Sequence, residues 1–599
     1  MQWPGSFESW QPKEVNKMLR IHLHKLLMAA LLVVAAIGDP ARSQGSLQSG
    51  DVPTVLIHYP ELVFINGRVL IADDDFSAAE AIAIRDGKVL LSGETAEVRR
   101  LAGPETILYD LNGGTVVPGF IDTHQHLHDY ATRELDVSLR WETVESGLEE
   151  VRVIARSTPA GEWIELSVRS YSARQVDRYR LDEVAPDNPL ALVLSTEEMI
   201  LNSRALERAQ FPSDATGLIK NSEGEPTGRI FSGQAAGMMV YEILPWPDIQ
   251  RVEELIEKEI ARENATGLTT IATRISPDAL TAVRNLWAEK RLNMRWRAIH
   301  QFADLNPDIE AWLKRLGNFS GLGDSMLKII GTSVISVDSA IGRGGAWTWK
   351  PKLRQLPGSL AGAYGVSRIE DRENSDFRAI VEVVRYGWSH VGVHSAGDRA
   401  NSELLEAYRL AKASPIVLVP DQRLGIDHGP MLTAEHIQSM RELGVIPSIA
   451  AKYLFDDPQN LVYFYGADAV DKMTPVRSVI DAGIRPVAEA DTGGAPMFHP
   501  LWQMQKFITR KDETGRVWNK DQSISRQQAL MMYTNWAARY TGDEEILGTL
   551  EPGKLADLVV LEGDFLEVPA ENLSQLKVLL TVLGGRVIYR DPAADLQEH

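Results

Sequence analysis

Two histidines that follow an apolar stretch are the first candidates for chemistry in this sequence. His124 and His126 come directly after residues 116–121, which we predict to form a buried parallel strand. Because side chains on a strand alternate between its two faces, both imidazoles leave the same face and can bind one ion. His22 and His24 share the spacing without such a strand, so a chance pair is the alternative. The strand setting favours a metal site at His124 and His126.

The run from Pro118 to His126, PGFIDTHQH, closely resembles the first-strand motif of the amidohydrolase superfamily. From about Val55 to Tyr589 the chain resembles the linear-amide hydrolases of that superfamily, the amidohydrolase 3 family, which includes N-substituted formamide deformylases. This resemblance implies an α/β fold with a (β/α)8 TIM-type barrel, whose strands end at a metal site. It also implies a small β-sandwich domain built from both chain ends, and an inserted subdomain that covers the site.

The resemblance implies four further metal ligands. His394 and His428 each end an apolar run, as the fifth-strand and sixth-strand histidines of the family do. Lys328 takes the position of a carboxylated lysine that bridges two ions; a lysine in an apolar strand otherwise needs an acidic partner or a path to solvent. Asp491 is implied to be both a metal ligand and the general base, with a helix N-cap as the alternative.

The composition limits the metal and the partners. The chain has no cysteine, which excludes disulfides, cysteine nucleophiles and thiolate ligands. Imidazole and oxygen ligands suit a divalent metal, zinc first and then iron, manganese or nickel, with one or two ions depending on Lys328. The 62 basic and 82 acidic residues give a net charge of −20, which argues against nucleic acid and anionic membranes. The expected partner is a small-molecule substrate.

Departures from the family pattern near the strand ends predict the substrate pocket. Glu489 lies two residues before Asp491 on the same strand face, so it is either a rival ligand or a pocket acid. Aromatic side chains in these stretches favour an amide with an aryl or bulky apolar arm, unless they belong to the core. The predicted pocket residues are Glu197, Tyr453, Glu489, His499 and Trp502.

Residues 1–43 have the pattern of a signal peptide. Basic residues Lys17, Arg20 and Lys25 precede the apolar residues 26–37, which form too short a run to cross a bilayer comfortably. An uncleaved anchor is the alternative, and Met18 is a second possible start. We therefore expect a periplasmic or secreted protein without stable membrane association after cleavage. A periplasm permits disulfides without requiring them.

The rest of the chain divides into three predicted parts. Residues 52–115 form one part of the β-sandwich, residues 116–545 the hydrolase barrel with an insertion at about 130–300, and residues 546–592 the second sandwich part. Asn66-Gly67 and Asp86-Gly87 are hairpin dipeptides between short apolar runs, so we expect two hairpins in the first part.

Together these residues predict an exported metal-dependent hydrolase that cleaves a carbon–nitrogen bond in a non-peptide amide. Metal-activated water attacks the carbonyl, and Asp491 moves the proton to the leaving nitrogen. Asp398 and Asp427 are expected to orient His394 and His428, or else to be plain surface residues. Hydrolysis of cyclic amides, dipeptides or esters is the enzymatic alternative. A non-catalytic secreted binding protein is the alternative outside enzymes.

Overall fold

The computed structural model describes most of the chain from residue 58 to residue 598. The residues outside the description are 1–57, 136, 169, 196–197, 232, 246, 302–308, 335, 356–360, 371, 373–374, 456–457, 493–498, 595 and 599. The predicted signal peptide and the predicted pocket residue Glu197 therefore lie outside the described residues. Across the described part, no helix combines the length and the apolar character that crossing a membrane requires.

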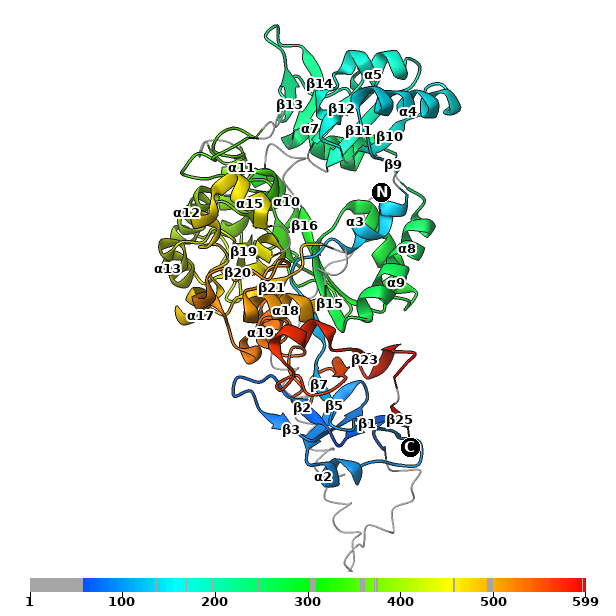
Figure 1. Cartoon of the computed structure of the whole chain (residues 1–599), viewed down its shortest axis with the longest axis vertical. Helices are drawn as coiled ribbons and strands as arrows, with labels where there is room; N and C mark the ends of the chain where they lie inside the picture. Colours follow the sequence, from blue (N-terminus) through cyan, green and yellow to red (C-terminus); the bar gives the residue numbers. More distant parts are fainter. Residues whose placement is uncertain are drawn as a thin grey trace, which may run out of the picture. The chain divides into compact units, whose positions relative to one another are not determined.

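Eight parallel strands carry the strand ends on which the predicted site depends (Figure 1). They form two four-stranded sheets, in the orders β17-β16-β15-β8 and β18-β19-β20-β21. Neighbouring strands in each sheet run parallel, so their C-terminal ends meet at one edge. The strands are β8 (Phe120–Asp122), β15 (Leu268–Arg274), β16 (Arg295–Gln301), β17 (Leu327–Ser333), β18 (His394–Ser395), β19 (Leu424–His428), β20 (Val445–Ala450) and β21 (Val487–Glu489).

The two sheets adjoin at both of their outer edges. At one edge, His390 forms isolated parallel bridges with Thr332, on β17, and with Leu424, on β19. At the other, the backbone N–H of Thr123 donates to the Ala488 carbonyl at 3.3 Å. These bonds follow the predicted strand order but do not make one unbroken ladder. The α/β class is confirmed, whereas the closed (β/α)8 barrel stays a prediction.

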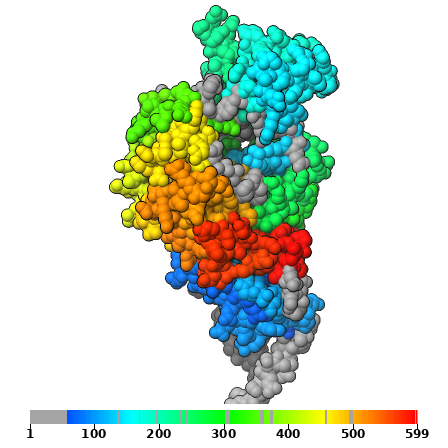
Figure 2. All heavy atoms as spheres, viewed as in Figure 1, coloured from blue at the N-terminus to red at the C-terminus, as the bar shows by residue number. Residues whose placement is uncertain are grey.

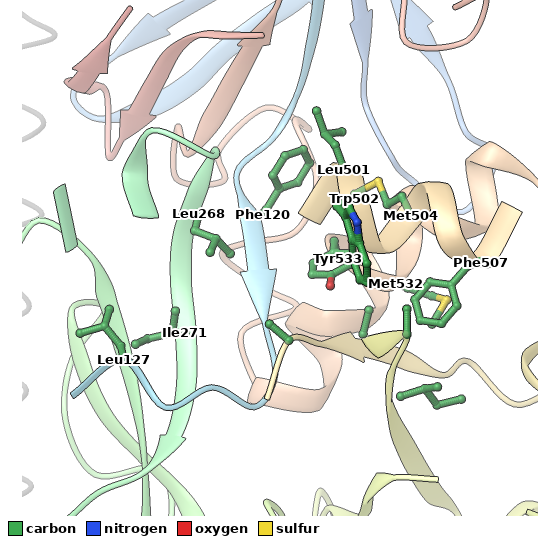
Figure 3. Packing of buried hydrophobic residues seen from close by; sticks show 14 of the residues in the cluster. Phe120, Leu127, Leu268, Ile271, Leu501, Trp502, Met504, Phe507, Met532 and Tyr533 are labelled. Atoms are coloured by element: carbon green, nitrogen blue, oxygen red, sulfur yellow. The ribbon is translucent and has the colours of Figure 1, made fainter. Parts of the chain in front are cut away.

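Helices between the strands bury their apolar faces against the sheets. α8 (Ile249–Asn264) buries Val252 and Ile256, and α18 (Pro500–Thr509) contributes Leu501 and Trp502 to the same cluster as Phe120 on β8 (Figure 3). Burial of one such side chain contributes roughly 1.5–3 kcal/mol. The other long helices are α9 (Pro277–Ala288), α10 (Ile309–Leu316), α11 (Ser375–Arg385), α12 (Asp398–Ala413), α13 (Ala434–Leu443), α15 (Pro458–Tyr465), α19 (Arg526–Met532) and α20 (Asn535–Thr541).

The apolar run before His124 forms two strands rather than the single strand that the sequence predicts. β7 (Thr115–Pro118) pairs with β2 and β22 outside the parallel sheets, and β8 begins one residue later. Gly119 separates them, and a Cβ there would lie 2.4 Å from the Thr269 hydroxyl oxygen, so only glycine fits. The boundary between the two parts of the fold therefore lies at Gly119 and not at residue 116.

Strands from both chain ends form two further sheets. The orders are β25-β6-β1-β4-β5 and β24-β23-β22-β7-β2-β3, and Figure 2 shows the red C-terminal region against the blue N-terminal region. Phe64 and Ile82 of the first sheet share a buried cluster with Val560 and Val582 of the second. The strands are β1 (Leu62–Ile65), β2 (Arg68–Leu70), β3 (Ala78–Ala79), β4 (Ala81–Arg85), β5 (Lys88–Gly93), β6 (Ile107–Asp110), β22 (Leu558–Leu561), β23 (Val578–Leu583), β24 (Arg586–Arg590) and β25 (Gln597–Glu598).

One of the two predicted hairpins is confirmed. β4 and β5 pair antiparallel around Asp86 (φ 55°) and Gly87 (φ 71°), which is the backbone of a type I′ turn. The prediction of a hairpin at Asn66-Gly67 is wrong. β1 pairs with β4 and β6, whereas β2 pairs with β3 and β7, so the turn passes the chain from one sheet to the other.

The insertion is shorter than the predicted 130–300. It forms its own six-stranded sheet, in the order β13-β14-β12-β11-β10-β9, with α4 (Val144–Ser157) among its helices. The predicted end at about 300 is wrong, because β15 and β16 belong to the parallel sheets. That the insertion covers the site stays a prediction. Its strands are β9 (Ser138–Leu139), β10 (Ile164–Val168), β11 (Leu190–Ser195), β12 (Glu198–Leu201), β13 (Leu218–Lys220) and β14 (Pro226–Phe231).

Candidate metal centre

Three of the predicted ligands meet at the C-terminal ends of β8 and β21. His124 and His126 follow β8, and Asp491 follows β21. The Nε2 atoms of His124 and His126 lie 3.3 Å and 3.1 Å from Asp491 Oδ1. One donor atom from each of the three residues lies within 4.8 Å of the other two, which is a spacing that one metal ion can bridge.

His394 and His428 join this group from β18 and β19. The His428 ring centroid lies 5.4 Å from that of His124 and 4.4 Å from that of His394. His428 Nδ1 is 4.0 Å from Asp491 Oδ2. The structure thus brings together five of the six side chains that the sequence assigned to the metal.

Carboxylates lie beside the Nδ1 atoms of three of these imidazoles and accept a hydrogen bond from two of them, His126 and His428. A carboxylate that accepts the Nδ1 proton leaves the lone pair of Nε2 free for a metal ion. His428 Nε2 is buried and, among the described residues, has no hydrogen-bond partner, which is costly unless a cation occupies it. The donor set therefore fits a divalent metal. The three contacts are His124 Nδ1 to Asp427 Oδ2 at 3.1 Å, His126 Nδ1 to Asp129 Oδ2 at 2.7 Å, and His428 Nδ1 to Glu489 Oε1 at 2.5 Å.

The backbone at two of these positions is strained. His428 has a φ of 78° and Asp491 a φ of 48°, in the left-handed region that non-glycine residues seldom adopt. Such a conformation costs of order 1–3 kcal/mol and persists only where the surroundings fix it. Asp122 supplies part of that support, since its buried carboxylate accepts from the backbone N–H groups of His124 at 3.1 Å and Ala490 at 3.1 Å.

Burial sets the protonation of the imidazoles. Burial, assisted by the positive charge of Arg274, holds the pKa of His124 well below its usual value, and burial lowers the pKa of His428 to about 3. Burial also lowers the pKa of His126, but its hydrogen bonds to Asp129 and Asp491 outweigh that effect and raise the pKa to about 9. His124 and His428 are thus neutral at pH 7, the form that binds metal, and His126 must release a proton on binding.

The second oxygen of Asp491 is held by two neighbouring residues. Lys452 Nζ lies 2.9 Å from Asp491 Oδ2, and the Tyr453 hydroxyl donates to the same oxygen. Burial alone would raise the pKa of Asp491, but the positive charge of Lys452 and the hydrogen bond from His126 more than offset it and lower the pKa well below its usual value. Asp491 is therefore ionised. Tyr453 lies beside the candidate metal ligands, as its prediction as a pocket residue requires.

The prediction that Lys328 lies with the metal ligands is wrong. Lys328 is the second residue of β17, five residues and about 16 Å before the C-terminal end of that strand. Its Nζ donates to the Gly542 carbonyl at 2.9 Å and to Asp543 Oδ1 at 2.5 Å. Asp543 also pairs with Arg297 at 2.6 Å. The alternative stated for a lysine in an apolar strand was an acidic partner, and Asp543 is that partner.

Acidic residues near the site take other roles than those predicted. Glu489 is fully buried and accepts hydrogen bonds from His428 Nδ1 and, at 2.6 Å, from the Ser448 hydroxyl. It therefore orients His428, a candidate metal ligand, and does not line a pocket. Asp427 contacts His124 and not His428. Asp398 accepts from the Trp349 backbone at 3.0 Å, so its predicted role beside His394 is wrong.

Two predicted pocket residues have structural contacts. His499 accepts the Leu501 backbone N–H at 3.3 Å and so caps α18. Trp502 is 7% exposed, packs in the main core near Phe120 and donates to Glu513 at 3.2 Å (Figure 3). Trp502 is therefore a core residue, which was the alternative for the aromatic side chains.

Sequence reasoning missed two residues at the site. Arg274 ends β15, with its Nη2 3.3 Å from His124 Nε2. Asp338 lies 3.4 Å from His394 Nε2 and accepts the Ala396 backbone N–H at 3.0 Å. The sequence contains a pattern that could have identified Arg274, because this residue ends an apolar strand as the histidines do. Asp338 lies in a loop and has no such pattern.

Replacing Lys328 by methionine is expected to leave the metal content per chain unchanged. The free energy of unfolding should fall by about 1–3 kcal/mol, because the buried Asp543 loses one of its two cationic partners. Elemental analysis and urea denaturation measure the two quantities. Lys314→Met, which removes an exposed pair with Glu310, is the control and should change neither. Loss of half the metal in Lys328→Met would instead support the prediction that Lys328 bridges two ions.

Known proteins resemble the chain over most of its length. It is 26% identical over 557 residues to the N-substituted formamide deformylase of Arthrobacter pascens, covering 88% of this chain and 98% of that protein. It is 25% identical to Protein LONG AFTER FAR-RED 3 of Arabidopsis thaliana, covering 88% and 91% of the two chains. An uncharacterized metal-dependent hydrolase from Pyrococcus horikoshii shares the fold, with a TM-score of 0.63 at 19% identity over 85% of this chain and 99% of that one.

The amidohydrolase family profile matches residues 108–589, which include both groups of parallel strands and every described candidate ligand. The resemblance seen in the first-strand motif therefore extends through the whole fold, and the chain belongs to the amidohydrolase family.

Proposed function

We propose that this chain is an exported, metal-dependent hydrolase that cleaves a carbon–nitrogen bond in a linear, non-peptide amide. The convergence of His124, His126, His428 and Asp491 at one edge of the parallel strands carries the proposal. Export rests on the pattern of residues 1–43 alone. An eight-stranded barrel closed around these strands is part of the same proposal.

The candidate ligands for the metal are His124, His126, His394, His428 and Asp491. Imidazole nitrogens and a carboxylate oxygen, with no sulfur, suit zinc above other divalent metals. When bound, such a metal supplies Lewis acidity for the amide carbonyl and lowers the pKa of a water molecule toward 7. Whether one or two ions bind depends on ligands other than Lys328.

Asp491 has the geometry of a proton carrier. Its Oδ1 faces the histidines, whereas its Oδ2 faces Lys452 and Tyr453. The ionised carboxylate accepts a proton from the attacking water and delivers it to the nitrogen that leaves. Lys452 keeps the carboxylate ionised before the first transfer and holds the side chain in place for the second. Glu489 holds His428 in its orientation throughout, and Asp427 lies beside His124 Nδ1.

Similarity to a formamide deformylase over nearly its whole length supports a linear amide as the substrate class. The aryl-arm preference now rests on Tyr453, because Trp502 belongs to the core. The alternatives remain cyclic amides, dipeptides or esters on the same strands, and a binding protein without catalysis.

A substrate panel on the metal-loaded protein tests the proposal. N-formyl and N-acetyl amines should be hydrolysed with kcat/KM at least about tenfold above those of matched esters, lactams and dipeptides. Release of the amine is measured directly. Higher turnover of a lactam or dipeptide would move the assignment to that class. Metal-loaded protein that hydrolyses none of the compounds would favour the binding protein.

A further inference from the structure

Among the described residues, Arg274 is a strongly basic side chain at the candidate centre that takes no part in the proposed proton transfers. It ends β15, is half-buried and extends to within 3.3 Å of His124 Nε2. Its Nη1 also donates a hydrogen bond to the Ser336 hydroxyl at 3.3 Å. In the described part of the chain, no carboxylate forms an ion pair with its guanidinium.

Lys452, the other cation beside the centre, differs from Arg274 in this respect. Its Nζ binds both the carboxylate and the main-chain oxygen of Asp491, so its charge is paired within the protein. Arg274 has five N–H donors. Within the described part of the chain, two of them have acceptors, which are the Ser336 hydroxyl and the neutral imidazole of His124. A half-buried guanidinium with so few anionic contacts is the group that an anionic ligand would pair with.

The contact with His124 directs Arg274 toward the reacting part of the site. His124 Nδ1 lies 3.1 Å from Asp427 Oδ2, whereas Nε2 is the nitrogen that faces both Asp491 and Arg274. A lone pair given to a metal ion is no longer an acceptor for Arg274. The guanidinium would then stand beside a second positive charge, an arrangement that an anion placed next to both would stabilise.

We propose that the substrate carries a carboxylate close to the scissile amide and that Arg274 binds this carboxylate. Planar guanidinium groups pair with carboxylates through two parallel hydrogen bonds, which fixes orientation as well as position. The substrate class is then an N-acylated compound with an acid group, and neutral formamides are poorer substrates. This inference rests on the proposed amide hydrolysis and narrows it.

Three matched compounds test the proposal on the metal-loaded protein. N-formylphenylalanine carries the carboxylate, N-formylphenylalanine amide replaces it by a neutral group, and N-formylphenethylamine lacks it. The wild-type protein should favour the acid over both neutral compounds by about 10- to 100-fold in kcat/KM. In Arg274→Gln this preference should fall to about twofold or less, mainly through KM for the acid. The ratio within one protein is independent of how much of that protein is folded.

A binding measurement supplements the kinetics. In the Asp491→Asn background, in which turnover of the acid is expected to be slow, calorimetry should show at least about tenfold weaker binding of N-formylphenylalanine when Arg274→Gln is added. Arg409→Gln, which removes an exposed arginine paired with Glu406, is the matched control and should leave both results unchanged.

Two outcomes would overturn the inference. Equal loss of kcat for all three compounds in Arg274→Gln would make Arg274 a stabiliser of the reacting carbonyl instead. Wild-type protein that hydrolyses the neutral compounds as well as the acid would show that no carboxylate is recognised. Both outcomes leave amide hydrolysis standing. Failure to hydrolyse any amide, in contrast, would remove the proposed function itself.

Discussion

Replacing Asp491 by asparagine should lower kcat by about 10²- to 10⁴-fold while much of the bound metal remains. Asparagine keeps the size of the side chain and an oxygen for the position of Oδ1, which faces the Nε2 atoms of His124 and His126. It cannot accept and return a proton as a carboxylate does. Steady-state kinetics on the best amide of the panel gives kcat, and elemental analysis gives the metal content.

Asp398→Asn is the matched control for this change. Asp398 begins α12 beyond the strand that carries His394, and it accepts backbone N–H groups of Trp349 and Arg399. Its replacement should change kcat less than threefold. Full activity in Asp491→Asn would remove Asp491 as the general base. Loss of the metal together with the activity would show that Asp491 acts chiefly as a ligand.

The strand-end histidines could be predicted because their signal is local. An apolar run followed by a histidine is visible within ten residues. This pattern gave His124 and His126, and together with the family resemblance it gave His394 and His428. What orients these rings is not local. The carboxylate of Glu489 that accepts from His428 Nδ1 is 61 positions away in the sequence, and no pattern around either residue pairs them. The ligands were therefore predictable, but their hydrogen-bond acceptors were not.

The same distinction explains the wrong predictions. Lys328 looked like a ligand because its strand looked like the others, but its partner Asp543 lies 215 residues later, beyond any sequence window. Asn66-Gly67 marks a bend between two strands correctly, yet it cannot show whether the flanking strands pair with each other. Trp502 follows a predicted ligand closely in sequence, but the helix that contains it faces the core. Local chemistry identifies candidates, and packing decides their partners.

Removing the metal with a chelator should lower turnover to below about 1% and lower the melting temperature by several degrees. The buried Nε2 of His428, without a partner in the described part of the chain, and the ionised Asp491 are both stabilised by a bound cation. A ligand that binds only the folded protein, at a free concentration about 1,000 times its Kd, contributes about 4 kcal/mol. Calorimetric melting and amide turnover are measured before chelation, after it, and after zinc is restored.

The double variant His124→Asn/His126→Asn separates metal binding at this site from other effects of the chelator. It lacks the two Nε2 donors that face Asp491, so its melting temperature should be low from the start and insensitive to chelation. A melting temperature that still fell on chelation would place the stabilising ion elsewhere on the protein, and the proposal of a metal at the ends of β8 and β21 would be wrong.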